Sequence, residues 1–132
     1  MIGLGTNVLL RAFTDESDPH APRARRLLEQ LAESGETVHV NHIVLCEFAW
    51  VLQRSKRLSR AKVAELIELL LCARALHIHE QDAVEEALRT YRASRTDFPD
   101  CLIGVLNRRA GCATTYSFDR RAAETADFSP VP

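Results

Sequence analysis

Four acidic residues from three separate segments of the chain have side chains and positions suited to a catalytic site. Glu47 lies in an apolar helical stretch, and Asp119 directly follows a predicted strand. Asp97 and Asp100 stand three residues apart at the predicted start of a helix, so they share one face. If these elements converge, Glu47, Asp100 and Asp119 form an acidic pocket with Asp97 at its rim.

Carboxylates that are pushed together repel one another unless a cation joins them. Hard oxygen ligands favour Mg²⁺ or Mn²⁺, which bind few carboxylates and keep several water molecules. Such an ion generates a hydroxide nucleophile and neutralises the charge that develops on a phosphate. The four residues therefore predict a metal-dependent site for phosphodiester hydrolysis.

Each acidic residue also has a structural explanation. Asp97 and Asp119 are good helix N-caps, and Asp100 in a first turn complements the helix dipole. Glu47 differs because its neighbours in sequence are apolar, where an unpaired carboxylate is costly, although a solvated helix face would also explain it. The prediction of a site therefore depends on the combination of residues.

Alternating strands and helices must position these side chains. The predicted strands are residues 2–4, 37–40, 76–79 and 113–115. The predicted helices are residues 6–13, 21–34, 41–52, 59–74, 82–94 and 97–111, with a short last helix capped by Asp119. Thr6, Asn41 and Ser59 are the expected N-caps of three of them, and residues 14–22 are an expected loop.

This order indicates an α/β fold with a mostly parallel central sheet and helices on both faces. Ligands in such sheets bind at the carboxyl ends of strands, where Gly5 and Asp119 are expected. A length of 132 residues predicts one domain that covers residues 1–132.

Composition limits the class of protein. Hydrophobic residues make up 46% of the chain and charged residues 27%, as in ordinary globular proteins, and no apolar run is long enough to span a membrane. Met1 leads directly into a predicted strand, so we expect no signal peptide. The cysteines lack a Cys-x-x-Cys spacing, which favours reduced thiols in a cytoplasmic protein.

The net charge of −1 argues against a domain that is basic as a whole, but arginine greatly outnumbers lysine. Its planar fork suits phosphate, so Arg54, Arg57, Arg108 and Arg120 are candidate RNA contacts. Solvated helix faces and a genomic bias toward arginine are the alternatives.

Two other patterns in the sequence suggest different sites, and both are weaker. Gly3-Leu4-Gly5 after a strand lacks the third glycine of a dinucleotide-binding fingerprint. A zinc site is conceivable for four histidines, but no cysteine or acidic partner has ligand spacing, so strand and loop histidines are favoured: His39, His42, His77 and His79.

Four segments, in this order and spacing, resemble the PIN-domain nucleases, most closely the VapC-type toxins of VapBC toxin–antitoxin systems. They are residues 1–10, the Glu47 helix, the Asp100 helix and the segment Ser117-Phe118-Asp119. The resemblance implies a three-layer PIN-like sandwich and a Mg²⁺-dependent endoribonuclease that cuts RNA, often tRNA or rRNA. It also implies a homodimer and a cognate VapB-type antitoxin whose C-terminal segment fills the active-site groove.

The resemblance also implies roles for individual residues. Glu47, Asp100 and Asp119 correspond to acidic metal-site residues, and Asp97 corresponds to an auxiliary one. Polar residues that support the site in the family correspond to Thr6, Asn7 and Ser117.

Gly5 is the departure from the family pattern, which normally reads Asp-Thr-Asn at this point. Loss of that carboxylate predicts weaker metal binding and little or no activity. Three explanations are open: an engineered inactive form, a naturally inactive relative, or a protein that binds without cutting. The alternative function is therefore a non-catalytic PIN-fold module that binds RNA or an antitoxin.

Overall fold

The computed structural model describes residues 1–14 and 17–132, so part of the expected loop 14–22 lies outside the described residues. Helices and strands alternate along most of the chain, as expected. In chain order they are β1 Ile2–Gly3, α1 Thr6–Phe13, α2 Ala21–Glu33, β2 Val38–Val40, α3 His42–Trp50, a π-helical turn Val51–Ser55, α4 Arg60–Cys72, β3 Leu76–Ile78, α5 Gln81–Ala93, α6 Phe98–Arg109, β4 Thr115–Ser117, a 3₁₀ turn Ala122–Glu124 and β5 Phe128–Pro130.

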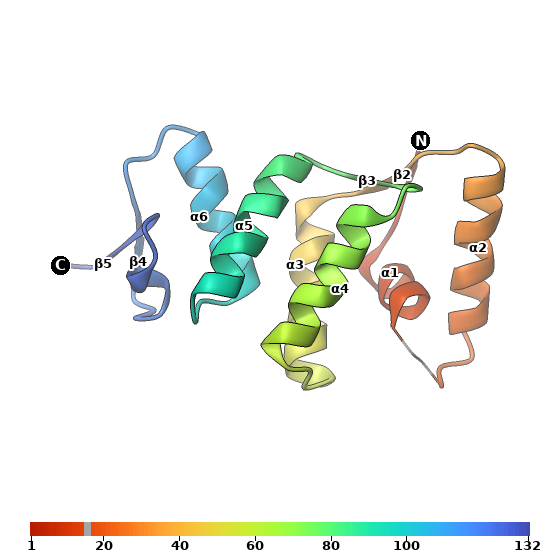
Figure 1. Ribbon diagram of the computed structural model, residues 1–132, viewed down its shortest axis with the longest axis horizontal. Helices are drawn as coiled ribbons and strands as arrows, with labels where there is room; N and C mark the ends of the chain where they lie inside the picture. The colour runs from red at the N-terminus through yellow and green to blue at the C-terminus, as the bar shows by residue number, and fades with distance from the viewer. Residues whose placement is uncertain (15–16) are drawn as a thin grey trace.

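All the strand pairings are parallel, but the strands form two sheets rather than one. The first sheet has the order β1-β2-β3, and β4 pairs with β5 in the second. Figure 1 shows β4 and β5 at one end of the molecule and α2 at the other, with α3 and α4 between them. Strand direction was thus predicted correctly, whereas the division into two sheets and the last strand were not anticipated.

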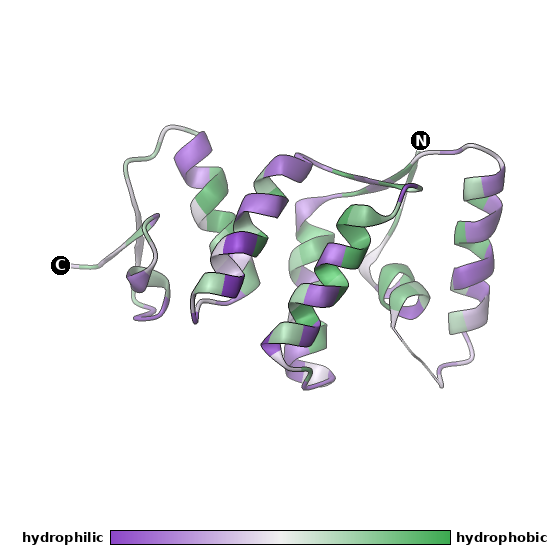
Figure 2. Cartoon of the chain, viewed as in Figure 1, coloured by the Kyte–Doolittle hydropathy of each residue, from purple (hydrophilic) through white to green (hydrophobic). Residues whose placement is uncertain are grey.

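The core is a cluster of buried side chains from the first sheet and from helices that include α3, α4 and α5. Phe48, Leu52, Ile67 and Tyr91 are fully or almost fully buried there, together with Val38 on β2. Figure 2 shows hydrophobic residues along α4 and polar residues over much of α2. Among the described helices, none combines the length and the apolar character that crossing a bilayer requires.

Local capping signals explain where several helices begin. Asn41 accepts a hydrogen bond from Val44 N at 2.9 Å, and Ser59 accepts one from Lys62 N at 3.2 Å, as predicted. The cap predicted for α1 is wrong, because Gly5 occupies the N-cap position and Thr6 is the first helical residue. The hydroxyl of Thr6 turns instead toward α3.

Candidate functional site

Asp100 is the centre of a group of three carboxylates. It lies in the first turn of α6 and is half-buried. Burial raises the pKa of Asp100, and the negative charges of Asp119 and then Asp97 raise it further. The acidic residues from α6 and from the segment after β4 are therefore electrostatic neighbours.

A tight turn holds Asp119 next to this helix. The backbone N–H of Asp119 donates to Ser117 Oγ at 3.0 Å, and Asp119 Oδ1 accepts from Arg121 N at 2.8 Å and from Ala122 N at 3.4 Å. Asp119 was predicted to cap the short last helix, but Arg121 occupies the N-cap position of the 3₁₀ turn, and Asp119 bonds to the backbone from two residues before it. Thr96 connects this turn to the start of α6, because its hydroxyl donates to the Arg121 carbonyl at 2.8 Å.

Asp97 occupies the N-cap position of α6 but makes no side-chain capping bond. Its Oδ1 accepts a hydrogen bond from Gln53 Nε2 at 3.2 Å instead. Gln53 lies in the π-helical turn after α3, far from Asp97 in sequence. The predicted N-cap position of Asp97 is therefore confirmed, but its side chain does not make the capping bond, and Gln53 is a contact that the sequence did not reveal.

Glu47 is exposed on α3, so its apolar sequence neighbours do not bury it. Its carboxylate accepts a hydrogen bond from the hydroxyl of Thr6 at 2.9 Å. This bond connects the first turn of α1, directly after Gly5, to the middle of α3. The expectation that apolar side chains surround the Glu47 carboxylate is wrong. The alternative, a solvated helix face, describes its surroundings.

Gly5 adopts φ −82° and ψ 161°, which is extended backbone open to any residue. A Cβ atom built there would have Asn7 Oδ1, at 3.9 Å, as its nearest neighbour outside the adjoining residues. The backbone therefore does not require glycine at this position, and the space accommodates a larger side chain.

The residues of the candidate site form two neighbouring groups, each of which contains at least one carboxylate. Gly5, Thr6 and Glu47 make one, and the carboxylates around Asp100 make the other. The two lie close, because Cys46, adjacent to Glu47 in the chain, has a thiol pKa that is raised first by burial and then by the charge of Asp100. In the part of the chain that the structure describes, no three Cys, His, Asp or Glu side chains are arranged to hold a metal ion by themselves.

The donor set nevertheless fits Mg²⁺ or Mn²⁺. These ions take oxygen ligands, often from only one or two carboxylates, with water in the remaining positions. The neighbouring carboxylates of Asp97, Asp100 and Asp119 are such ligands, and their mutual repulsion falls when a cation is present.

An apolar pocket of about 330 Å³ borders Glu47 between α3 and α6. Its wall includes Ile43 and Trp50, both substantially exposed, together with Ile103 of α6. The pocket presents apolar surface directly beside an acidic residue of the candidate site.

The four arginines predicted to contact RNA have different surroundings. Arg54 lies over the ring of Trp50 at 4.3 Å, and Arg108 pairs with Asp127 at 2.8 Å and also with Glu86. Arg57 and Arg120 are exposed. Arg108 is thus already engaged by carboxylates within the chain.

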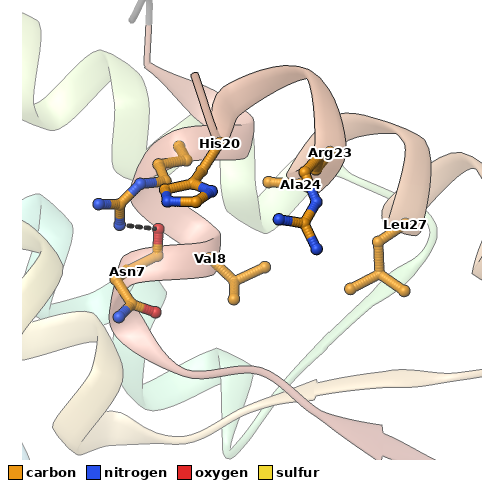
Figure 3. A pocket seen from close by; sticks show the side chains of 7 residues that line it. Asn7, Val8, His20, Arg23, Ala24 and Leu27 are labelled. Atoms are coloured by element: carbon orange, nitrogen blue, oxygen red, sulfur yellow. Dashed lines mark hydrogen bonds between the residues drawn. The ribbon is translucent and has the colours of Figure 1, made fainter. Parts of the chain in front are cut away.

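A larger cavity of about 550 Å³ lies between α1 and α2. Figure 3 shows His20 and Arg23 on one side of it and Asn7 and Val8 on the other. Arg11 also lines it, donating to the Asn7 carbonyl at 3.2 Å. Arg11 and Arg23 therefore lie near the segment after Gly5, and no sequence pattern distinguishes them from the other arginines.

Arg60 has a role that the sequence also did not reveal. Its guanidinium donates to the carbonyls of Tyr91, Ser94 and Thr96 at 2.8, 3.1 and 2.9 Å, and it lies 4.0 Å from the centre of the Tyr91 ring. Arg60 thus fixes the connection between α5 and α6, immediately before Asp97.

Comparison with known proteins gives a consistent result. The chain is 26% identical over 118 residues to a VapC ribonuclease from Aquifex aeolicus (strain VF5), and the match covers 89% of this chain and 87% of that protein. A family profile described as PIN domain matches residues 4–128. Because that match spans nearly the whole chain, this protein belongs to the PIN-domain family.

Proposed function

We propose that this chain is a VapC-type nuclease, the toxin of a toxin–antitoxin pair, whose acidic site acts on RNA with Mg²⁺ or Mn²⁺ and is impaired by Gly5. The observation that carries the proposal is the group of carboxylates around Asp100, whose pKa is raised by burial and by Asp119 and Asp97. The VapC ribonuclease to which the chain is similar supports the choice of substrate.

The contacts of the acidic residues support a proposed role for each. Asp100 and Asp119 would hold the metal ion, and Asp97, whose side chain accepts a hydrogen bond from Gln53, would add negative charge at the rim. Glu47 orients a water molecule with the help of Thr6, which holds its carboxylate. A bound ion would activate water and offset charge on the scissile phosphate.

Asn7 and Ser117 support the site. Asn7 Oδ1 lies beside the space that a side chain at position 5 would fill, and Ser117 accepts the N–H of Asp119. Because position 5 has no carboxylate, the group of Gly5, Thr6 and Glu47 offers a metal ion one acidic ligand fewer than the family pattern would. We therefore expect weak metal binding and little or no cleavage by the chain as it stands.

Manganese binding tests the proposed site directly. Electron paramagnetic resonance of Mn²⁺ titrated into the protein should show weak binding, because oxygen ligands on neighbouring carboxylates are present. Asp100→Asn should abolish it, whereas Asp82→Asn, on α5, should leave it unchanged. Equal Mn²⁺ affinity in all three proteins would contradict the assignment of the metal ligands.

A second candidate function is a non-catalytic module that binds RNA or an antitoxin. Gly5 is the observation that favours it, because the chain lacks one carboxylate at that point. Failure of a Gly5→Asp variant to cut RNA while it remains folded and binds RNA would favour this second function.

The proposal includes a VapB-type antitoxin as partner. The apolar pocket between α3 and α6 supports it, since exposed Ile43, Trp50 and Ile103 offer surface for an apolar segment beside Glu47. Trp50→Ala should then weaken capture of the cognate antitoxin, and unchanged capture would argue against this surface.

The proposal also includes a homodimer. β1 is an edge strand of the first sheet. The Ile2 N–H donates to the Thr37 carbonyl just before β2, and the Leu4 N–H donates to the His39 carbonyl, so the N–H of Gly3 faces away from β2. Open edges favour pairing with another chain, and Tyr116 and Phe118 near β4 are exposed as well. Light scattering that finds only single chains at high concentration would contradict the dimer.

A further inference from the structure

Four of the five histidines gather around the ends of two neighbouring strands. His39 on β2 and His77 on β3 are direct partners in the parallel register. His79 follows β3, and His42 is the first residue of α3. Val38, Val40 and Ile78, which alternate with these histidines, are buried on the opposite face of the sheet: the imidazoles therefore lie on its outer face.

The Nδ1 atoms of His39 and His77 are 3.1 Å apart, and the two rings stack with centroids 5.3 Å apart. A neutral imidazole has one donor and one acceptor nitrogen, so at this contact one Nδ1–H donates a hydrogen bond to the other Nδ1. The separation also suits a shared metal ion. Two nitrogens at zinc–nitrogen distances of about 2.0–2.1 Å, with angles between about 90° and 109°, lie roughly 2.9–3.4 Å apart.

The other two histidines differ in availability. The ring of His79 lies 5.8 Å from that of His39, and its side chain is about half exposed, so it has room to rotate. His42 Nε2 lies 2.6 Å from the His79 carbonyl, so that nitrogen is engaged by backbone. Within residues 1–14 and 17–132, no three potential ligands are already arranged around one point. The site therefore begins with two protein ligands.

We propose that His39 and His77 bind a divalent transition-metal ion such as Zn²⁺ through their Nδ1 atoms. Imidazole nitrogen suits Zn²⁺, Ni²⁺ and Cu²⁺, in contrast with the oxygen ligands around Asp100. On binding, both rings carry their hydrogen on Nε2, so the ring that donated from Nδ1 changes tautomer by exchange with solvent, and water fills the remaining positions or His79 rotates in. Pairing of adjacent parallel strands fixes the two ligands relative to each other.

Calorimetric titration of the full chain with ZnCl₂ tests this site. We expect one bound equivalent of modest affinity, and His39→Ala and His77→Ala should each weaken binding by roughly tenfold or more, because even the loss of a supporting partner costs about that much. His20→Ala, between α1 and α2, is the matched control and should bind as the parent does. A Cys72→Ser, Cys112→Ser double variant should also bind normally, which separates the site from the exposed thiols.

Thermal unfolding of each variant without metal shows that it remains folded, and His39→Gln and His77→Gln provide second substitutions that keep polar side chains on the sheet. Absence of Zn²⁺ binding by the parent would overturn the proposal. Binding that survives in both folded histidine variants, or that disappears in the cysteine variant, would overturn it as well.

Discussion

At the scale of single residues, Gly5 occupies a position whose backbone conformation does not require glycine. Its φ and ψ are ordinary for any amino acid, and a Cβ atom there contacts only Asn7 Oδ1 at 3.9 Å. The position is also the N-cap of α1, where Asp is among the preferred residues and Gly is less favourable. Neither conformation nor space explains the glycine.

Asp100 leads to a prediction about pH and stability. Because its pKa is raised in the folded chain, mainly by burial, the folded state holds the proton more tightly than the unfolded state. In strong acid Asp100 is protonated in both states and resembles asparagine. As the pH rises through the folded pKa, ionisation penalises the folded state, so Asp100→Asn should be more stable than the parent at neutral pH.

Urea unfolding with chelator, measured from acidic to neutral pH, checks this difference. Asp82→Asn is a control of opposite sign, because a hydrogen bond from Arg109 lowers the pKa of Asp82. That variant should lose stability at neutral pH and recover relative to the parent in acid. If the parent has a higher free energy of unfolding than Asp100→Asn at neutral pH, burial and the neighbouring charges do not destabilise the ionised Asp100 side chain, and the prediction is wrong.

At the scale of elements, local signals predicted more than long-range ones. Asn41 and Ser59 cap α3 and α4 as expected, because an N-cap depends on residues only three positions away. The contacts that position the site join distant segments. Gln53 with Asp97, and Thr6 with Glu47, arise only when helices pack, so no spacing in the sequence revealed them.

Arg60 gives the prediction at this scale. It donates to three carbonyls in the connection from α5 to α6, and its loss leaves those groups without a charged donor. Arg60→Met should destabilise the fold by about 2–4 kcal/mol, since hydrogen bonds to charged groups contribute more than neutral ones. Chemical denaturation measures the effect.

Arg89→Met is the matched control, because Arg89 is an exposed arginine on α5. Substitutions at such surface positions usually change stability by no more than about 0.5 kcal/mol. If Arg60→Met and Arg89→Met unfold at the same denaturant concentration, the connection before Asp97 does not depend on Arg60.

At the scale of the whole molecule, the sequence predicted parallel strands and a family but not how the strands associate. The alternation of strands and helices fixes strand direction, and β1, β2 and β3 pair as that pattern requires. Which strands become neighbours depends on long-range packing, and β4 pairs with the unanticipated β5. Likewise the acidic residues approach one another, although their arrangement in two groups was not predictable from spacing.

For the whole molecule, we propose that this PIN-domain protein is a nuclease whose site lacks one carboxylate. Gly5→Asp places that carboxylate in open space beside Asn7, and Gly5→Asn provides a side chain of similar size and capping ability without the charge. In both variants the free energy of unfolding should equal that of the parent or exceed it by no more than a few tenths of a kcal/mol.

The most direct test is cleavage of RNA by the parent, Gly5→Asp and Gly5→Asn proteins side by side, with Mg²⁺ or Mn²⁺ and with chelator. We predict that only Gly5→Asp cuts efficiently and only with metal. If Gly5→Asp is folded and binds Mn²⁺ but cuts no better than Gly5→Asn, position 5 is not the lesion and the claim is contradicted.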